Sequence, residues 1–207
     1  KATSANASAT ASEIKALVKL GTLVAIFGFA IFEAAASAQF SYIERFGVSL
    51  QISNQEIGFS LLIASFLGIP GAFSIFVMGT RFGTLAPLAF GVSIAIVGMI
   101  ILLNAVDNDA YFIGSCCMGF SWAFSLPFIQ SLLASMDRKG SVIAAGTSLS
   151  VFGAAVGPAM GALVVANQRY ESVFILAITL FTLSLLAFLY IGYHGDLKDE
   201  EYDRQQT

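Results

Sequence analysis

Six long apolar runs alternate with short polar breaks along the chain. Each run is close to or above the roughly 20 residues that a helix needs to cross the hydrocarbon of a bilayer. The breaks and the two chain ends contain nearly all of the charged residues. This pattern predicts an all-α polytopic membrane protein with a bundle of six transmembrane helices, over residues 17–43, 57–79, 84–104, 110–135, 142–166 and 172–193.

The two ends of the chain differ from the apolar runs. Residues 1–15 are rich in small polar side chains and predict a flexible cytoplasmic linker in front of a six-helix domain over residues 16–194. Residues 195–207 are charged and predict a cytoplasmic tail. Because the chain begins with Lys1, we expect the later part of a longer polypeptide, with a processed N-terminus as the alternative.

Composition supports the membrane class and excludes several functions. Hydrophobic residues make up 57% of the 207 residues and charged residues only 11%, against about 25% charged in soluble domains. A net charge of −3 gives no reason to expect a nucleic-acid partner. The two cysteines, Cys116 and Cys117, are adjacent within an apolar run, which disfavours a disulfide framework or a metal site. We expect no cofactor and no metal.

The basic residues predict the orientation of the chain. With six spans both ends lie on one side of the membrane, and eight of the ten basic residues fall on that side. Only Arg45 and Arg169 fall on the other. By the positive-inside rule both termini are cytoplasmic, and we expect an integral multi-pass protein of the cell (inner) membrane.

One ionisable side chain, Glu33, lies near the middle of a predicted span. A charged carboxylate at that depth costs about 2.5–3.5 kcal/mol on insertion scales, so it needs a partner or water. Ser37 shares its helix face one turn further on. Glu33 is either a protonated acid that is hydrogen-bonded to a neighbouring helix or a proton or substrate site, and we favour the second interpretation.

The fourth run has the most mixed character. Trp122, the only tryptophan, lies in mid-membrane rather than at an interface, where tryptophans are commonest. Ser125 lies on an adjacent face, and Gln130 follows further along. Trp122 either fills a gap between helices or forms the aromatic wall of a substrate cavity, in which Ser125 and Gln130 supply hydrogen-bonding groups.

The fifth run contains a stripe of small residues at helical spacing. In a membrane helix such a stripe lets a neighbouring helix approach closely. A proline beside the stripe removes a backbone donor and leaves the Ala154 carbonyl without its helical partner. The stripe and its proline consist of Gly146, Ser150, Gly153, Gly157, Pro158 and Gly161.

Two local motifs carry a resemblance to the major facilitator superfamily of transporters. Arg81-Phe82-Gly83, in the very tight loop after the second run, resembles the family's D-R-x-G loop signature, with Thr80 at the acidic position. The segment from Gly153 to Gly161 is similar to the family's G-x-x-x-G-P-x-x-G pattern. Six spans, the tight loop and the basic loop after the fourth span resemble the C-terminal six-helix half of such a transporter.

The resemblance implies two inverted three-helix repeats and transport of a small solute by alternating access, without enzyme activity. Its first and fourth helices would line the cavity, with Glu33 as a proton-coupling candidate. Its second and fifth helices would contact the other half, which is either an N-terminal half of the same chain or a second copy. Arg81, Gly83 and the glycine stripe would serve gating and packing, so Gly157→Leu should block transport without affecting insertion. The alternative is a non-transporting sensor or assembly module, which the replacement at Thr80 favours.

Overall fold

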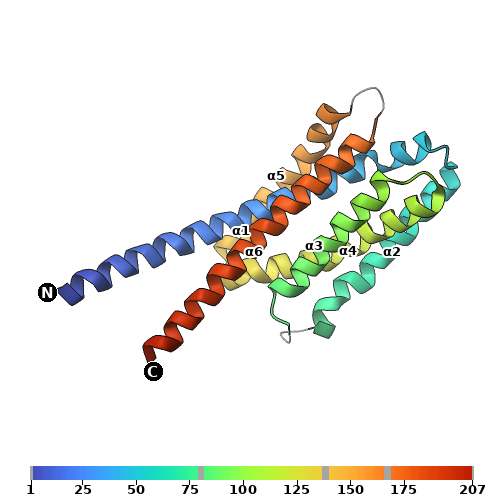
Figure 1. Ribbon diagram of the computed structural model, residues 1–207. Helices are drawn as coiled ribbons and strands as arrows, with labels where there is room; N and C mark the ends of the chain where they lie inside the picture. The colour runs from blue at the N-terminus through green and yellow to red at the C-terminus, as the bar shows by residue number, and fades with distance from the viewer. Residues whose placement is uncertain (1, 79–81, 137–139, 166–168, 207) are drawn as a thin grey trace.

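A computed structural model describes most of the chain. It describes the backbone of residues 2–78, 82–136, 140–165 and 169–206, and within these ranges the side chains of residues 20–193. The described residues form six α-helices that lie roughly side by side, and the first and last helices extend past the others at the same end (Figure 1). The helices are α1 (Ala2–Ser49), α2 (Asn54–Met78), α3 (Leu85–Leu103), α4 (Asn108–Met136), α5 (Ser141–Val164) and α6 (Glu171–Gln206).

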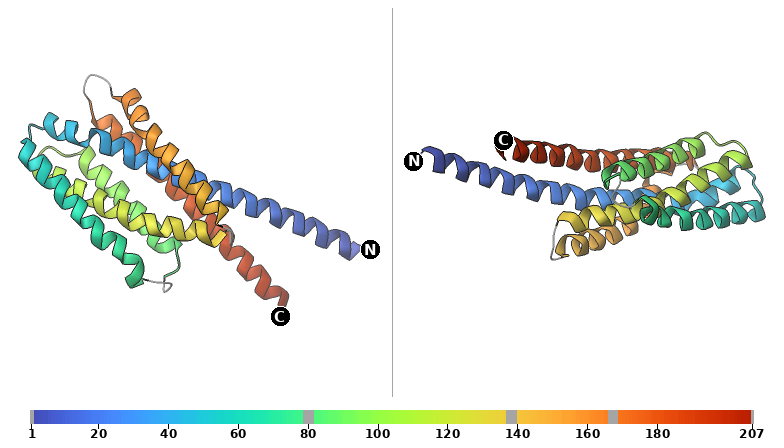
Figure 2. Two further views of the ribbon diagram at one scale, coloured as in Figure 1. Left: turned by 180° about the vertical axis from the view of Figure 1, so that it is seen from behind. Right: turned by 90° about the horizontal axis from the view of Figure 1, so that it is seen from below.

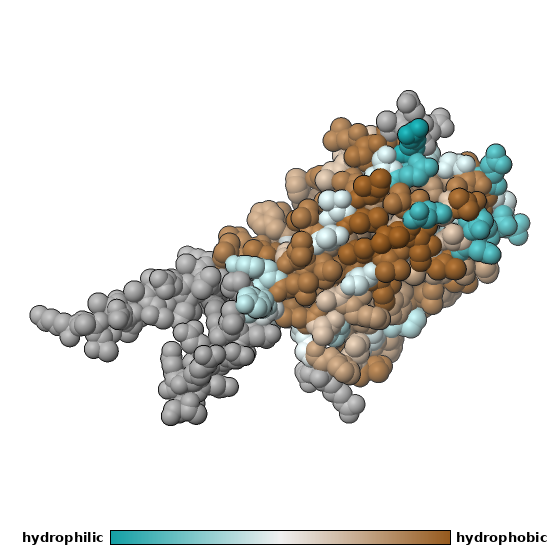
Figure 3. Space-filling view, viewed as in Figure 1, coloured by the Kyte–Doolittle hydropathy of each residue, from teal (hydrophilic) through white to brown (hydrophobic). Residues whose placement is uncertain are grey.

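All six helices are long and apolar enough to cross a membrane, which confirms the prediction of an integral multi-pass membrane protein. The apolar segments run over Leu20–Ser49, Asn54–Met78, Leu85–Leu103, Asn108–Met136, Ser141–Val164 and Glu171–Tyr193. On the face that Figure 3 shows, the surface between the two ends of the bundle is mostly hydrophobic, and strongly hydrophilic side chains gather at the end opposite the chain termini. A lipid environment satisfies such a surface, whereas water does not.

The first helix continues beyond its predicted end at residue 43. It runs to Ser49, and its last turns still contain buried residues. Phe46 is buried and meets the ring of Phe174 edge-on at 4.7 Å, while the Tyr111 hydroxyl donates to the Ile43 carbonyl oxygen at 3.3 Å. The first turns of α1 and the last turns of α6 cover the segments for which we expected a linker and a tail, and the side chains of both lie outside the described residues.

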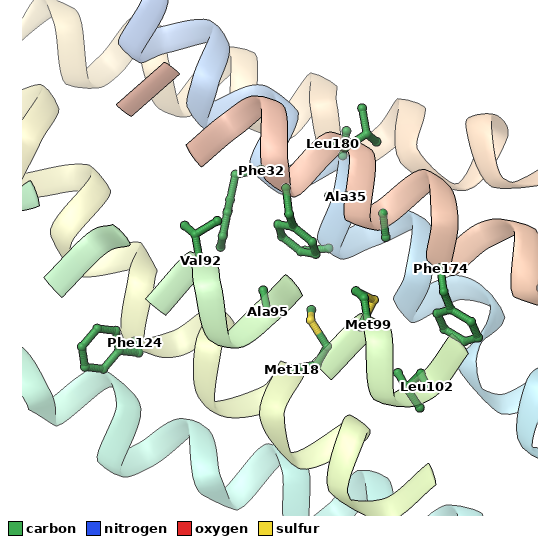
Figure 4. Close-up of a cluster of buried hydrophobic side chains, with 14 of the residues drawn as sticks. Phe32, Ala35, Val92, Ala95, Met99, Leu102, Met118, Phe124, Phe174 and Leu180 are labelled. Atoms are coloured by element: carbon green, nitrogen blue, oxygen red, sulfur yellow. The ribbon is translucent and has the colours of Figure 1, made fainter. Parts of the chain in front are cut away.

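The helices pack in a fixed set of pairs. α1 packs mainly against α5 and α6, α4 packs mainly against α2 and α3, and α3 packs against α6 (Figure 2). The hydrophobic core lies between α1, α3, α4 and α6, which contribute, among other side chains, Phe32, Val92, Met118 and Leu180 (Figure 4). Within the described residues α2 and α5 make no contact with each other. α2 and α5 therefore lie apart from each other, α2 mainly against α4 and α5 mainly against α1.

The packing of the helices follows the same plan when α1 is exchanged with α4, α2 with α5 and α3 with α6. α1 on α5 becomes α4 on α2, and α1 on α6 becomes α4 on α3. Two boundaries repeat with a shift of 86 residues, since α3 begins at Leu85 and α6 at Glu171 (171 minus 85), and α2 ends at Met78 and α5 at Val164 (164 minus 78). The end of α1 and the start of α2 repeat at the end of α4 and the start of α5 with a shift of 87 (136 minus 49 and 141 minus 54). Three helices are an odd number, so consecutive sets of three start on opposite sides of a membrane.

Individual contacts repeat with the same shift. A Cβ atom added at Gly157 would meet the Ala34 oxygen at 2.5 Å and the Ala38 nitrogen at 2.9 Å. A Cβ atom added at Gly71, 86 residues earlier, would meet the Phe120 oxygen at 2.8 Å and the Phe124 nitrogen at 3.1 Å. Ala34 and Phe120 are also 86 residues apart, and so are Ala38 and Phe124. Matching backbone contacts indicate that the six helices form two three-helix units with a common plan.

Candidate functional site

The structure brings together two residues that the sequence singled out separately. The indole N–H of Trp122, on α4, donates a hydrogen bond of 3.2 Å to the carboxylate Oε1 of Glu33, on α1. Glu33 is partly buried, and Trp122 keeps 42% of its surface exposed. The pair bridges α1 and α4 at a place where the Trp122 side chain stays partly exposed. We call this place the α1–α4 seam.

Glu33 lies deep in the membrane-spanning part of α1. It is 13 residues from Leu20 and 16 from Ser49, the ends of the apolar segment, which places it about 20–24 Å from either end at 1.5 Å per residue. The basic residues whose side chains are described are Arg45 and Arg169, and Arg45 lies 12 residues further along α1, about 18 Å away. Within the described part of the chain the carboxylate therefore has a hydrogen-bond donor but no neighbouring positive charge.

Ser37 lies one turn from Glu33 and binds α5 instead of facing only the seam. Its hydroxyl donates a hydrogen bond of 2.6 Å to the carbonyl oxygen of Ala154. This is the carbonyl that Pro158 leaves without a helical donor. The Tyr42 hydroxyl also donates to the Pro158 carbonyl oxygen, at 3.2 Å. Two side chains of α1 thus satisfy the backbone of α5 around its proline.

The remaining candidates on α4 occupy different positions. Ser125 is fully buried and packs toward α3, where its Oγ lies against Gly91. That hydroxyl has no hydrogen-bond partner among the described residues. Gln130 is partly buried about two turns beyond Trp122. Among these candidates, the hydrogen bond that joins two of them within the described residues is the one between Trp122 and Glu33.

The glycine stripe requires a correction, because it faces a helix of the same bundle. Gly153 lies against the Ala30 carbonyl, Gly157 lies against the α1 backbone at Ala34, and Gly161 lies against the Tyr42 ring. All of the stripe's glycines are buried within this chain. Gly146, the first glycine of the stripe, lies against Leu133 on α4. A stripe that α1 and α4 already cover is not available as the contact surface between two six-helix halves. The close approach was predicted correctly, but its partner was not.

The tight loop between α2 and α3 is only partly described. Gly83 has a φ of +64°, a left-handed conformation that suits glycine and allows the sharp turn into α3. Arg81, the other gating candidate in this loop, lies outside the described residues. The described geometry therefore supports a turn at Gly83 and leaves the role of Arg81 as a prediction.

One polar residue was missed by the sequence analysis. Gln39 is only 2% exposed, and its Oε1 has no hydrogen-bond partner among the described residues. It is the only amide side chain within the apolar run 17–43, and that isolation was the available signal. Its position is also 86 residues before Ser125, whose buried hydroxyl likewise has no hydrogen-bond partner among the described residues.

Together, the six apolar spans and their packing define a polytopic α-helical membrane protein with a polar pair between its central helices. Comparisons with family models and with curated proteins find no match to this chain. Statements about its activity therefore depend on the chemistry of its own residues.

The hydrogen bond from Ser37 to α5 allows a direct test. Ser37→Ala should lower the free energy of unfolding by about 1 kcal/mol, because the Ala154 carbonyl would lose its only side-chain donor among the described residues. Thermal unfolding in detergent measures the change. Ser41→Ala is the matched control, since the Ser41 hydroxyl binds only its own helix at the Ser37 carbonyl. Equal effects of the two substitutions would show that the contact with α5 contributes nothing.

Proposed function

We propose that this chain is one six-helix half of a secondary active transporter that moves a small solute by alternating access. The observation that carries the proposal is the Glu33–Trp122 pair at the α1–α4 seam. A carboxylate near mid-membrane is costly, and such residues typically face an aqueous cavity and serve substrate or proton pathways.

The arrangement of the helices supports the same proposal. Transporters of the major facilitator type, which the sequence motifs resemble, consist of halves built from inverted three-helix repeats around a site near the bilayer midplane. The exchange pattern of the helix pairs and the shift of 86 residues fit such a half. The first helices of the two repeats are α1 and α4, and these are the helices that carry Glu33 and Trp122.

A half of this kind needs a second wall for its cavity. We propose that a second six-helix unit, either an N-terminal half of the same chain or a second copy, covers the α1–α4 seam. The solute then binds between the two units, and Glu33 exchanges a proton during the cycle. We place the protein in the cell (inner) membrane with both termini in the cytoplasm, following the distribution of basic residues.

Replacement of the carboxylate tests the coupling role. Proteoliposomes that contain the protein should accumulate a transported solute when a pH gradient is imposed, and Glu33→Gln should reduce this accumulation to the level of protein-free liposomes. Glu44→Gln is a suitable control because Glu44 is an exposed acid on the same helix, 11 residues further along. Unchanged proton-driven accumulation in Glu33→Gln would remove the coupling role from this residue.

A specific observation favours a second candidate function. Thr80 stands where the family's loop signature has an acidic residue, and a protein that had kept the fold without the transport cycle would not need that acid. In this reading the chain is a membrane sensor or assembly module, and Glu33 and Trp122 hold α1 and α4 together. Net movement of any solute by the purified protein would eliminate this alternative.

A further inference from the structure

We infer that the α1–α4 seam binds an organic cation: an amine or quaternary ammonium group on an apolar body. The inference rests on the proposed transport function and specifies its substrate class. It is carried by the charge of Glu33, the placement of the Trp122 ring and the scarcity of other polar groups beside them. Each of these points to a positively charged ligand.

The charge balance is the first argument. Within the described residues the Glu33 carboxylate has a single hydrogen-bond donor, the indole N–H of Trp122. An ionised carboxylate offers about four acceptor positions, so most of its capacity stays open. In a low-dielectric setting an unpaired negative charge attracts any available positive partner strongly and repels an anion. The nearest described basic side chain on the same helix, Arg45, is 12 residues away.

The aromatic ring supplies the second argument. Because the N–H of Trp122 points at Oε1, the edge of the indole is turned toward the carboxylate and leaves the ring faces for other contacts. Tryptophan offers the strongest cation–π surface among the side chains, and it acts within about 6 Å of the ring centroid. Trp122 is 42% exposed, so a ligand can reach part of its side chain. A cation beside Glu33 would contact charge and ring together.

Other ligand classes fit the seam less well. A hard metal ion such as Mg²⁺ or Ca²⁺ is held by about six or more oxygens, whereas the seam offers one carboxylate beside an indole. An anionic solute would face the Glu33 charge without a described basic partner. A neutral sugar would need several convergent hydrogen-bonding groups, and Ser37 already donates to the Ala154 carbonyl. An organic cation needs only the two groups that are present.

A pair of ions with equal shape and opposite charge tests the inference. Tetraphenylphosphonium and tetraphenylborate would be titrated into the detergent-purified chain, in which Trp122 is the only tryptophan and its fluorescence reports binding. We expect saturable quenching by the phosphonium ion and none by the borate. Glu33→Gln should weaken phosphonium binding about tenfold or more, while Glu44→Gln should not change it. Equal binding of both ions, or unchanged binding in Glu33→Gln, would overturn the inference.

A transport measurement separates this inference from the proposal on which it rests. Proteoliposomes would be offered a cationic, a neutral and an anionic solute of similar size under one pH gradient. Movement of the cation alone supports both statements. Movement of only the neutral or the anionic solute keeps the transport function and overturns the cation class. Phosphonium binding without movement of any solute supports the cation site and contradicts the transport function.

Discussion

Gly157→Leu is expected to prevent stable packing of the bundle, with a loss of about 3 kcal/mol or more in the free energy of unfolding. A Cβ atom at this position would lie 2.5 Å from the Ala34 oxygen and 2.9 Å from the Ala38 nitrogen. Both partners are backbone atoms of α1, so the neighbour cannot turn aside as a flexible side chain could. The helices would have to separate along most of their contact.

This expectation replaces the one drawn from the sequence. Had the stripe lain between two transporter halves, leucine would have blocked movement and left this half intact. Because Gly157 faces α1 of the same chain, leucine should disrupt the half itself. Membrane insertion of α5 should still be normal, since leucine is more apolar than glycine. The defect should therefore appear after insertion, when the helices pack.

The two cysteines provide the measurement for Gly157→Leu. Cys116 and Cys117 are the only cysteines and are partly buried on α4, so a thiol-reactive dye reports their exposure during heating in detergent. The control is Gly58→Leu, because a Cβ atom added at Gly58 meets nothing within 4 Å. Gly71→Leu should resemble Gly157→Leu, since its contacts with α4 repeat those of Gly157. A Gly157→Leu protein that unfolds at the wild-type temperature would contradict the α1–α5 contact.

The course of the chain through the membrane could be predicted from the sequence because it depends on local information. A run of about 20 apolar residues satisfies its own backbone only as a helix, whatever its neighbours are. The end of α1 could not be predicted in this way. Polar and charged residues such as Glu44 and Arg45 follow the apolar run, but Phe46 is held by Phe174 from another helix, and this contact keeps the last turns helical.

The candidate site, too, could be predicted only in part from the sequence. Glu33 and Trp122 could be singled out because an acid and a tryptophan are unusual in mid-membrane. Their hydrogen bond could not be foreseen, because it depends on how α1 and α4 lie against each other. The same holds for Ser37: proline chemistry predicted a free Ala154 carbonyl, but only the packing of α1 on α5 shows which side chain reaches it. The glycine stripe likewise predicted a close neighbour without identifying it.

Replacement of Gln39 is expected to raise the stability of the protein, whereas Gly157→Leu is expected to lower it. Its Oε1 is buried without a hydrogen-bond partner among the described residues, and an unsatisfied buried polar group costs about 1–3 kcal/mol. Gln39→Met keeps the length and approximate volume of the side chain and removes the unpaired oxygen. We therefore expect the protein to become more stable by about 1–3 kcal/mol, measured as a higher unfolding temperature with the same thiol-reactive dye.

The control for Gln39→Met is the same exchange at Gln55, which is exposed at the start of α2 and should leave stability nearly unchanged. Ser125→Ala should be neutral or slightly stabilising, because it removes the unpartnered hydroxyl at the position 86 residues later. A clear loss of stability in Gln39→Met would contradict the prediction and would mean that the folded protein holds a partner for this amide. Such a partner would have to reach the core between α1 and its neighbours, since Gln39 is only 2% exposed.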